Sequence, residues 1–409
     1  MKSHAQHSAI LGTLVESIFL WNPVKTEENP QIKYIDISSV NRDTKMIQAF
    51  AEIRAHEAPG RARQLVRSGD ILVSTVRPNL NAVAQVPDYL DGATASTGFT
   101  VLRPCPEVLD PRYLFQWVKT PEFICAMVNN ATGASYPAVS DRIVKESTIP
   151  LPSIAKQKRI AAVLDKADAL REKRHQTIAK LDRLLQSLFL ELFSKSGEYP
   201  LSELSDVCEF ITKGTTPAAS AIKVFPSEGD IPFLKVYHIM NDGTVSFDFK
   251  PSFISKTCHE KDLKRSKVLP GDVLMNIVGP PLGKIGLVPD TYREWNVNQA
   301  LAIFRPKSQL ESIYLLYALR SPKVLTGILN QAVGIRQLNL SLKQCRHTLI
   351  PLPPLPLQKQ FTAQVRKAKE IQLRQFAMLN YLTQLIKSLQ HRAFNGELFT
   401  ERPELVEVS

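Results

Sequence analysis

The sequence predicts an α+β protein made of two similar globular domains, each followed by a long helix. The first observation is that the chain contains itself twice: residues 68–72 (Ser-Gly-Asp-Ile-Leu) return as residues 270–274 (Pro-Gly-Asp-Val-Leu), an offset of 202. Near the end of each copy, residues 149–152 (Ile-Pro-Leu-Pro) return as residues 350–353, an offset of 201. A period this long exceeds that of a solenoid repeat and indicates a duplicated domain. The molecule should therefore have two equivalent ends.

Each globular domain carries strand signals followed by a helical signal. Short apolar or alternating runs bounded by turn residues predict strands. The predicted strands are residues 32–37, 70–74 and 100–102 in the first copy and 231–236, 272–276 and 302–304 in the second. Each copy then continues into one helical stretch, at 111–127 and at 312–329. Elements in this order predict an α+β domain.

Two long amphipathic helices follow the globular domains. From residue 154 and again from residue 355, apolar residues recur at steps of three and four, as in the seam of a coiled coil. Each helix has about 40 residues and a length of about 60 Å. Because each apolar stripe must be buried, we expect the two helices to pair with each other. An antiparallel pairing would give an approximate two-fold axis, with the polar midpoints Arg174 and Gln375 meeting where the helices cross.

The Pro-rich junctions divide the chain into segments of different charge. The predicted segments are a first globular domain at 1–153, a first long helix at 154–196, a second globular domain at 197–354, a second long helix at 355–396 and an acidic tail at 397–409. The net charge of +12 comes mainly from the helical segments, since residues 155–196 carry +5 and residues 355–396 carry +6. The first domain is neutral and the second carries +4. A basic surplus suggests a nucleic-acid partner, although a charged helix face is as often simply solvated.

Composition restricts the class of protein. An apolar content of 44% and a charged content of 22% are typical of globular chains. The sequence has no apolar run of the roughly 18–20 residues that a membrane span needs. Its first residues do not resemble a signal peptide, so we expect a cytoplasmic protein. The five cysteines are far apart and match no zinc or redox spacing, which predicts reduced thiols and no metal site.

Motifs for covalent chemistry are incomplete. Residues 279–285 (Gly-Pro-Pro-Leu-Gly-Lys-Ile) resemble a phosphate-binding loop, but the spacing is one residue short and Ile285 stands where Mg²⁺ needs a hydroxyl ligand. Asn22-Pro23 resembles the start of an adenine methyltransferase motif, but the aromatic residue that stacks on a flipped base is missing. We therefore expect no catalytic residues and no cofactor on this chain.

Taken together, the duplicated motifs resemble the specificity (S) subunit of type I restriction–modification systems. They are the Gly-Asp turns at 68–72 and 270–274, Asn298-Gln299 before the strand at 303–306, the junctions at 149–159 and 350–360, and the terminal run at 392–398. The resemblance covers nearly the whole chain. The first domain departs from the pattern, because Ser96-Thr97-Gly98 stands in place of Asn-Gln.

The resemblance implies a function and a set of partners. In that family each globular unit is a target-recognition domain that reads one half of a split double-stranded DNA sequence. The paired helices set the spacing and dock two modification subunits, which bind S-adenosylmethionine and methylate adenine. Separate restriction subunits use ATP and Mg²⁺ and cut the DNA. The chain itself is then expected to recognise DNA without catalysing a reaction.

Candidate DNA-reading residues are polar side chains in predicted loops, because Arg pairs well with guanine and Asn or Gln with adenine. The candidates are Arg77, Asn79, Asn81, Ser135, Tyr136, Lys213, Thr215, Thr216, Lys284, Arg336, Gln337 and Asn339. Two other readings of the chain stay open at this point. One is a methyltransferase or nuclease with degenerate motifs, and the other is a coiled-coil scaffold that binds only protein.

Overall fold

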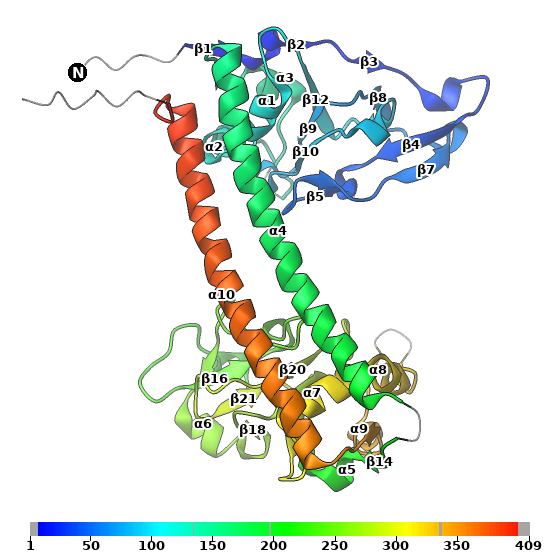
Figure 1. The fold of residues 1–409 in the computed structure, drawn as a ribbon, viewed down its shortest axis with the longest axis vertical. Helices are drawn as coiled ribbons and strands as arrows, with labels where there is room; N and C mark the ends of the chain where they lie inside the picture. Colours follow the sequence, from blue (N-terminus) through cyan, green and yellow to red (C-terminus); the bar gives the residue numbers. More distant parts are fainter. Residues whose placement is uncertain (1–6, 134, 196–197, 335–337, 400–409) are drawn as a thin grey trace, which may run out of the picture. The chain divides into compact units, whose positions relative to one another are not determined.

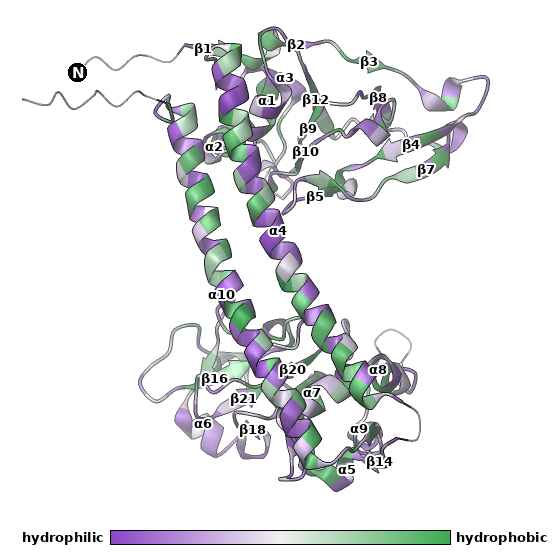
Figure 2. Cartoon of the chain, in the orientation of Figure 1, coloured by the Kyte–Doolittle hydropathy of each residue, from purple (hydrophilic) through white to green (hydrophobic). Residues whose placement is uncertain are grey.

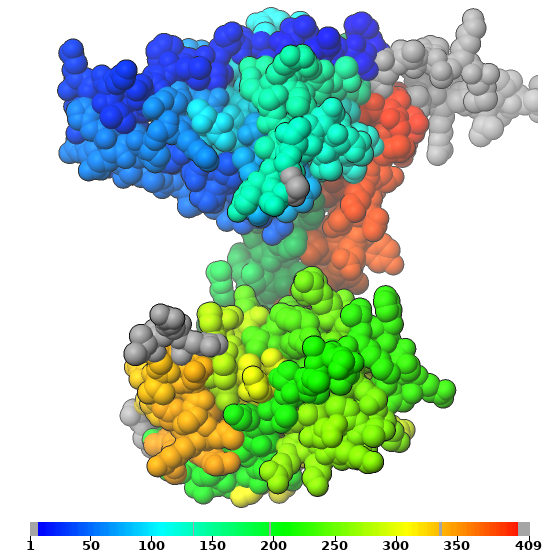
Figure 3. Space-filling model, turned by 180° about the vertical axis from the view of Figure 1, so that it is seen from behind, coloured from blue at the N-terminus to red at the C-terminus, as the bar shows by residue number. Residues whose placement is uncertain are grey.

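The computed structural model describes residues 7–133, 135–195, 198–334 and 338–399 and divides the chain into two compact units. Unit 1 comprises residues 1–176 and 377–409, and unit 2 comprises residues 177–376. Each unit contains one globular domain and half of each long helix (Figure 1). Figure 3 shows each globular domain as a closely packed body of its own sequence colours, blue to cyan for the first and green to orange for the second.

The globular domain of unit 1 combines short strands with short helices. Its strands are β1 (Ser8–Ile10), β2 (Val15–Glu16), β3 (Phe19–Leu20), β4 (Gln31–Ile35), β5 (Val40–Asn41), β6 (Met46–Ile47), β7 (Ala51–Arg54), β8 (Ala62–Leu65), β9 (Ile71–Ser74), β10 (Val83–Gln85), β11 (Thr94–Ser96), β12 (Phe99–Pro104) and β13 (Thr148–Pro150). Its helices are α1 (Pro111–Trp117), α2 (Pro121–Asn129) and α3 (Asp141–Glu146). A five-stranded sheet has the order β3-β8-β11-β4-β7, and a four-stranded sheet has the order β10-β9-β12-β2.

The globular domain of unit 2 repeats this plan. Its strands are β14 (Leu201–Glu203), β15 (Cys208–Lys213), β16 (Ile231–Leu234), β17 (Phe253–Ile254), β18 (Lys267–Val268), β19 (Val273–Asn276), β20 (Ile285–Leu287), β21 (Trp295–Val297), β22 (Leu301–Pro306) and β23 (Leu349–Pro351). Its helices are α5 (Leu204–Val207), α6 (Lys256–Glu260), α7 (Ser312–Arg320), α8 (Pro322–Leu329) and α9 (Leu342–Arg346). The sheet orders are β15-β22-β19-β20 and β17-β16-β21-β18.

The helical stretch of each domain is split in two, which differs from the single stretch that the sequence predicted. In unit 1 the break lies between α1 and α2, where Pro121 occupies the first turn and the Thr120 hydroxyl accepts from the Phe123 amide. In unit 2 the break lies between α7 and α8, where Pro322 has the same place. A proline is favoured in a first helical turn, because an N–H group at that position would have no acceptor within the helix and its loss costs nothing. The prolines therefore start new helices inside the predicted stretches.

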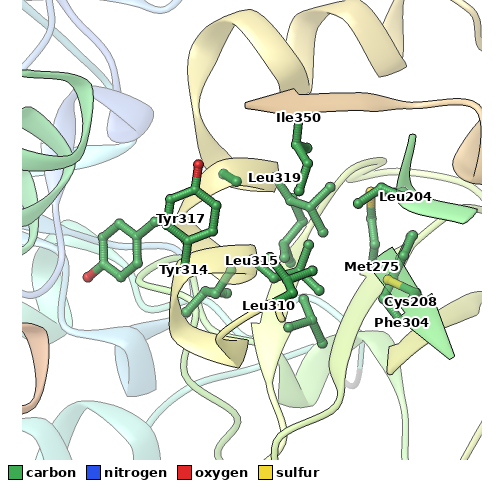
Figure 4. Packing of buried hydrophobic residues seen from close by; sticks show 14 of the residues in the cluster. Leu204, Cys208, Met275, Phe304, Leu310, Tyr314, Leu315, Tyr317, Leu319 and Ile350 are labelled. Atoms are coloured by element: carbon green, nitrogen blue, oxygen red, sulfur yellow. The ribbon is translucent and has the colours of Figure 1, made fainter. Parts of the chain in front are cut away.

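Each unit buries one main hydrophobic cluster between a sheet and the helices. In unit 1 this cluster joins β9 and β12 to α1, α2 and α3. In unit 2 it joins β19 and β22 to α7, and Figure 4 shows Met275 and Phe304 of these strands on one side of Leu315, with Tyr314 of the helix on the other side. The apolar residues that alternate along the strands pack against the apolar face of the helices inside the domain, as their periodicities require.

The two long helices complete both clusters. They are α4 (Ile154–Phe193) and α10 (Leu355–Phe394), and both alternate hydrophobic and hydrophilic residues along their length (Figure 2). In unit 1, Leu164 near the start of α4 shares the cluster with Phe394 at the end of α10. In unit 2, Phe193 at the end of α4 packs on Phe361 near the start of α10, with ring centroids 5.6 Å apart. The helices therefore run antiparallel, which confirms the predicted pairing.

Equivalent hydrogen bonds fix the start of each long helix in its domain. In unit 1 the Gln157 carbonyl oxygen accepts from the Asp110 amide at 2.9 Å, and its amide group donates to the Pro152 carbonyl at 2.9 Å. In unit 2 Gln358 makes the same pair of bonds, accepting from the Glu311 amide at 2.9 Å and donating to the Pro353 carbonyl at 2.9 Å. Both glutamines are fully buried. A glutamine at the same place in both copies thus joins each domain to its helix.

The contact between Arg174 and Gln375 stays a prediction. Arg174 belongs to unit 1 and Gln375 to unit 2. Among the described residues, no helix is long and apolar enough to span a lipid bilayer.

Candidate nucleic-acid interface

In unit 1, two loops carry most of the candidate residues and lie against each other. One loop follows β9 and contains Arg77, and the other precedes α3 and contains Tyr136. The Arg77 amide donates to the Pro137 carbonyl at 2.7 Å. The Arg77 guanidinium lies over the Tyr136 ring, 4.6 Å from its centroid, and both side chains are exposed. The stacking presents a cation with restricted freedom at the surface.

The loop after β9 has an unusual backbone that its own side chains support. Arg77 and Asn81 have positive φ angles of 50° and 45°, on either side of the 3-10 turn Pro78–Leu80. The Asn81 amide group donates to the Val118 carbonyl at 2.9 Å, so this side chain anchors the loop to the domain. Asn79 is exposed within the turn, as is Ser135 in the facing loop. Of the candidates in unit 1, Arg77, Asn79, Ser135 and Tyr136 therefore face solvent, and Asn81 does not.

The same pair of loops occurs in unit 2 with different side chains. The Gly279 amide donates to the Leu338 carbonyl at 3.1 Å, which matches the bond from Arg77 to Pro137. Val278 and Val333 both bridge to Asn339, as Val76 and Thr132 bridge to Ala138 in unit 1. Lys284 is half-buried at the end of its loop. The candidates Arg336 and Gln337 lie outside the described residues.

A further loop of unit 2 is held close to the turn between β21 and β22 that carries the Asn-Gln motif. Gly214 follows β15, and a side chain at this position would place its Cβ 2.2 Å from the Asn298 carbonyl oxygen. Only glycine permits so close a backbone approach. The Thr216 hydroxyl accepts from the Gln299 amide at 3.2 Å. The exposed residues Lys213 and Thr215 are thereby held at the edge of the sheet.

In each unit these loops gather at one edge of the four-stranded sheet, where the central strand ends. The Thr75 amide after β9 donates to the Gly98 carbonyl at 2.9 Å, and the Ile277 amide after β19 donates to the Ala300 carbonyl at 2.8 Å. Gly98 and Ala300 are therefore equivalent. This places Ser96-Thr97 of the first domain where the second has Asn298-Gln299, so the departure seen in the sequence falls inside the candidate interface.

A comparison with known protein families identifies the family of this chain. Residues 22–183 and 197–372 match the type I restriction modification DNA specificity domain. The chain belongs to this family. The two matched segments contain the two copies of the internal repeat, and the predicted resemblance is confirmed.

Individual specificity subunits are similar over much of their length. The chain is 26% identical over 340 residues to the specificity subunit of the type I restriction enzyme EcoBI from Escherichia coli, covering 73% of this chain and 70% of that protein. It is 23% identical over 359 residues to the MjaIX specificity subunit from Methanocaldococcus jannaschii, covering 81% and 78%. A chain in a solved structure on complex assembly and conformational transition of the type I R-M system is 26% identical, with a TM-score of 0.60 and coverage of 97% and 100%. The S subunit from M. genitalium, at 14% identity and a TM-score of 0.52 over 98% of this chain, shares the fold.

These matches make the protein a DNA-recognition subunit of a type I restriction–modification system, which associates with DNA and with other subunits of the system. The predicted function is confirmed at this level. The alternatives of a degenerate enzyme and of a protein-only scaffold are not favoured, because the matched family is defined by DNA specificity.

A lysine that was not among the candidates lies beside the loop that contains Arg77. The Lys45 ammonium donates to the Asn81 carbonyl at 2.6 Å, from a hairpin 36 residues away in the chain. Burial, together with the nearby charge of Lys119, lowers the pKa of Lys45 to about 8. No local pattern marks this residue, because its role depends on how the β5–β6 hairpin folds back onto the loop.

One group of potential metal ligands lies outside these loops. His259, Glu260 and Glu294 hold ligand atoms within 4.8 Å of one another. His259 is buried, and its Nε2 lies 3.4 Å from Glu294. The Lys267 ammonium already lies 2.6 Å from the Glu260 carboxylate. A lysine therefore balances one of the two carboxylate charges of this cluster.

Proposed function

We propose that this specificity subunit reads a two-part DNA target without catalysing a reaction itself, each unit reading one half. The proposal rests on one observation, which is that the loops at the edge of the sheet occur in both units. The backbone frame is equivalent in both units, but Arg77 is replaced by Gly279, and the exposed Thr97 is replaced by the exposed Gln299. An equivalent frame with different side chains is what two different half-sites require, because base contacts specify sequence.

The exposed side chains at this edge suit direct readout in the major groove. A guanidinium such as that of Arg77 pairs with guanine through two hydrogen bonds. Its stacking on Tyr136 reduces the freedom lost on binding. In unit 2 the exposed candidates Lys213 and Thr215 lie on a different loop, which is fixed by Gly214. We therefore assign the first half-site to the loops around Arg77 and the second to the loops around Thr215 and Asn339.

Two modification subunits would dock on the long helices, because each unit offers an equivalent apolar pair on its helices. In unit 1 the pair is Leu170 of α4 and Leu385 of α10, which are 48% and 50% exposed. In unit 2 it is Leu184 of α4 and Ile371 of α10, which are 66% and 47% exposed. Exposed apolar pairs repeated in this way fit two copies of one partner.

The chemistry of the system would then reside on its partners. The modification subunits would bind S-adenosylmethionine and methylate adenine, and restriction subunits would use ATP and Mg²⁺ to cut. The specificity subunit would contribute recognition and spacing. The assembly would work on cytoplasmic DNA.

The proposal is tested with the chain purified together with its modification partner. The complex is given S-adenosylmethionine and a randomised DNA library, and methylated adenines are mapped by single-molecule sequencing. We expect one motif made of two half-sites with a fixed gap. Methylation of an uninterrupted motif, or tight binding of S-adenosylmethionine to the purified chain alone, would contradict it.

A further inference from the structure

One buried histidine of unit 2 has a ring nitrogen without a hydrogen bond. His259 lies near the end of α6, and its side chain is 0% exposed. Its Nδ1 is hydrogen-bonded to the side-chain amide group of Asn296 in β21. Its Nε2 is buried and has no hydrogen-bond partner within the described part of the chain. Buried polar atoms of this kind are rare, so Nε2 is a candidate ligand atom for something bound there.

Two carboxylates lie beside this nitrogen. Nε2 is 3.4 Å from Oε2 of Glu294, the residue before β21, without forming a hydrogen bond to it. Glu260 follows His259 in α6, and the ligand atoms of all three side chains lie within 4.8 Å of one another. The side chains of Glu294 and Glu260 are 39% and 46% exposed, so an ion from solvent can reach them. The group therefore combines a buried imidazole with two carboxylates that are open to solvent.

The group has a surplus of negative charge. Lys267 of β18 lies 2.6 Å from Oε2 of Glu260 and balances that carboxylate. For Glu294, His259 is the one ion-pair partner within the residues that the structure describes. A neutral imidazole does not balance the charge of Glu294, whereas a divalent cation between the two side chains would.

The spacing of the ligand atoms suits a four-coordinate metal ion. Zn²⁺ binds an imidazole nitrogen or a carboxylate oxygen at about 2.0–2.1 Å, so two such ligand atoms lie about 3.3–3.4 Å apart in a tetrahedral site. The distance from Nε2 of His259 to Oε2 of Glu294, 3.4 Å, has this value. Glu260 can supply a third ligand from an exposed side chain that is free to rotate, and a water molecule can supply the fourth.

The other side of the imidazole ring has a partner that suits a metal ligand. A metal-bound histidine donates its second N–H to a fixed acceptor. The Asn296 amide group can supply that acceptor at Nδ1, because its oxygen and nitrogen exchange places when the group turns over. Ser266 Oγ lies 3.1 Å from this amide group and 3.1 Å from the Leu263 carbonyl. A hydroxyl that donates to Leu263 can accept from the turned amide group, so every group keeps a hydrogen bond.

The equivalent sheet of unit 1 forms without the carboxylate. The offset of 202 that makes Gly98 equivalent to Ala300 also makes Gly92 equivalent to Glu294. In both units the strand that follows this position pairs in parallel with the same neighbour, β11 with β4 and β21 with β16. The strand pairing therefore does not require Glu294, and this residue can be replaced without loss of the sheet.

We propose that His259, Glu260 and Glu294 bind a Zn²⁺ ion that holds α6 to the loop before β21. An imidazole ligand favours a transition-metal ion of this kind over Mg²⁺ or Ca²⁺, which prefer oxygen ligands alone. The spacing of the cysteines predicted no metal site, and this group contains no cysteine. The ion stabilises unit 2 and takes no part in DNA recognition, so the inference does not depend on the proposed function.

The test uses the full chain without DNA, first freed of metal with a chelator. Co²⁺ replaces Zn²⁺ as the probe, because its visible absorption distinguishes a four-coordinate site from a hydrated ion. We expect one four-coordinate Co²⁺ ion per chain, displaced by Zn²⁺ and not by Mg²⁺. Glu294→Gln should weaken the binding of Co²⁺ at least roughly tenfold. The control is Glu209→Gln, which changes an exposed glutamate on β15 in the other sheet of the domain and should leave the binding unchanged.

A second variant separates a metal site from a simple ion-pair network. Lys267→Met removes the ammonium that competes with the ion for Glu260, so this variant should bind Zn²⁺ more tightly than the wild-type chain. Zn²⁺ should also slow hydrogen–deuterium exchange of the α6 amides in the wild-type chain and not in Glu294→Gln. Absence of the four-coordinate Co²⁺ signal from the wild-type chain, or an equal signal in Glu294→Gln, would overturn the proposal.

Discussion

Arg103 is joined to Asp70 by two parallel hydrogen bonds, from Nε at 2.9 Å and from Nη2 at 2.7 Å. The same fork joins Arg305 to Asp272, at 2.8 and 2.7 Å. Asp70 and Asp272 also accept from the backbone amides of Arg67 and Leu269, which closes the Gly-Asp turn before the central strand. The repeated Gly-Asp turn therefore supplies one half of an ion pair, and an arginine 33 residues later in each copy supplies the other half.

Replacing Arg103 should destabilise unit 1. The side chains of Arg103 and Asp70 are 11% and 2% exposed, so Arg103→Met leaves a buried carboxylate without its cation. The expected loss is about 3–5 kcal/mol of unfolding free energy. Hydrogen–deuterium exchange of the β9 amides measures it. The control is Arg142→Met in an ion pair whose side chains are 81% and 58% exposed, where a change above about 1 kcal/mol would contradict the argument.

Replacing Arg77 should alter the recognition of one half-site only. Arg77→Ala removes the exposed guanidinium and leaves the backbone bond to Pro137 in place. We expect a loss of about 1–3 kcal/mol in discrimination at one base pair. Methylation of targets that vary in one half-site at a time measures it. If methylation of every variant of both half-sites is unchanged, Arg77 reads no base.

Replacing single leucines on the long helices should change the number of bound modification subunits. Leu184→Asp alters only unit 2, so the complex should fall from two partner subunits to one. Leu385→Asp should do the same through unit 1, and the double variant should bind none. The masses of the purified complexes measure this. The control is Leu373→Asp, because Leu373 is 68% exposed but its equivalent on α4 is Glu172, and a loss of subunits there would contradict the assignment.

The pH dependence of stability should carry the signature of Lys45. Its pKa is lowered from 10.5 to about 8 in the folded chain. Between these two values the unfolded chain binds the proton and the folded chain does not, so this group makes stability rise with pH over that range. Below about pH 8 the cost of charging the buried ammonium is fully present. From pH 8 to 10.5 the free energy of unfolding should rise less steeply with pH for Lys45→Met than for the wild-type chain. Equal slopes for the two chains would refute this prediction.

Local patterns in the sequence were enough to predict the broad fold. The steps of three and four placed both long helices, and the Gly-Asp turns at 68–72 and 270–274 placed the central strands. The single helical stretches were wrong at Pro121 and Pro322, where the helix-starting role of proline outweighed the apolar pattern. The strands are so short that their pairing partners could not be read from periodicity.

The candidate site was predicted in part. Arg77 and Tyr136 were both chosen as polar loop residues, but only the structure stacks one on the other. Asn81 was chosen for the same reason, yet its amide group donates a hydrogen bond to the Val118 carbonyl. Composition identifies a polar loop residue, but it cannot show which polar groups are already satisfied by the backbone of a distant segment.

The sequence by itself determined the duplication, the central strands, the two long helices and the resemblance to the family, because these depend on local composition and on repetition along the chain. Only the tertiary structure decided which side chains meet. It brought Lys45 to the loop at Asn81, Arg103 to Asp70, and Asp242 to Lys369. These contacts join segments far apart in the chain, and they form because buried polar groups must find partners wherever the packing of the core leaves them.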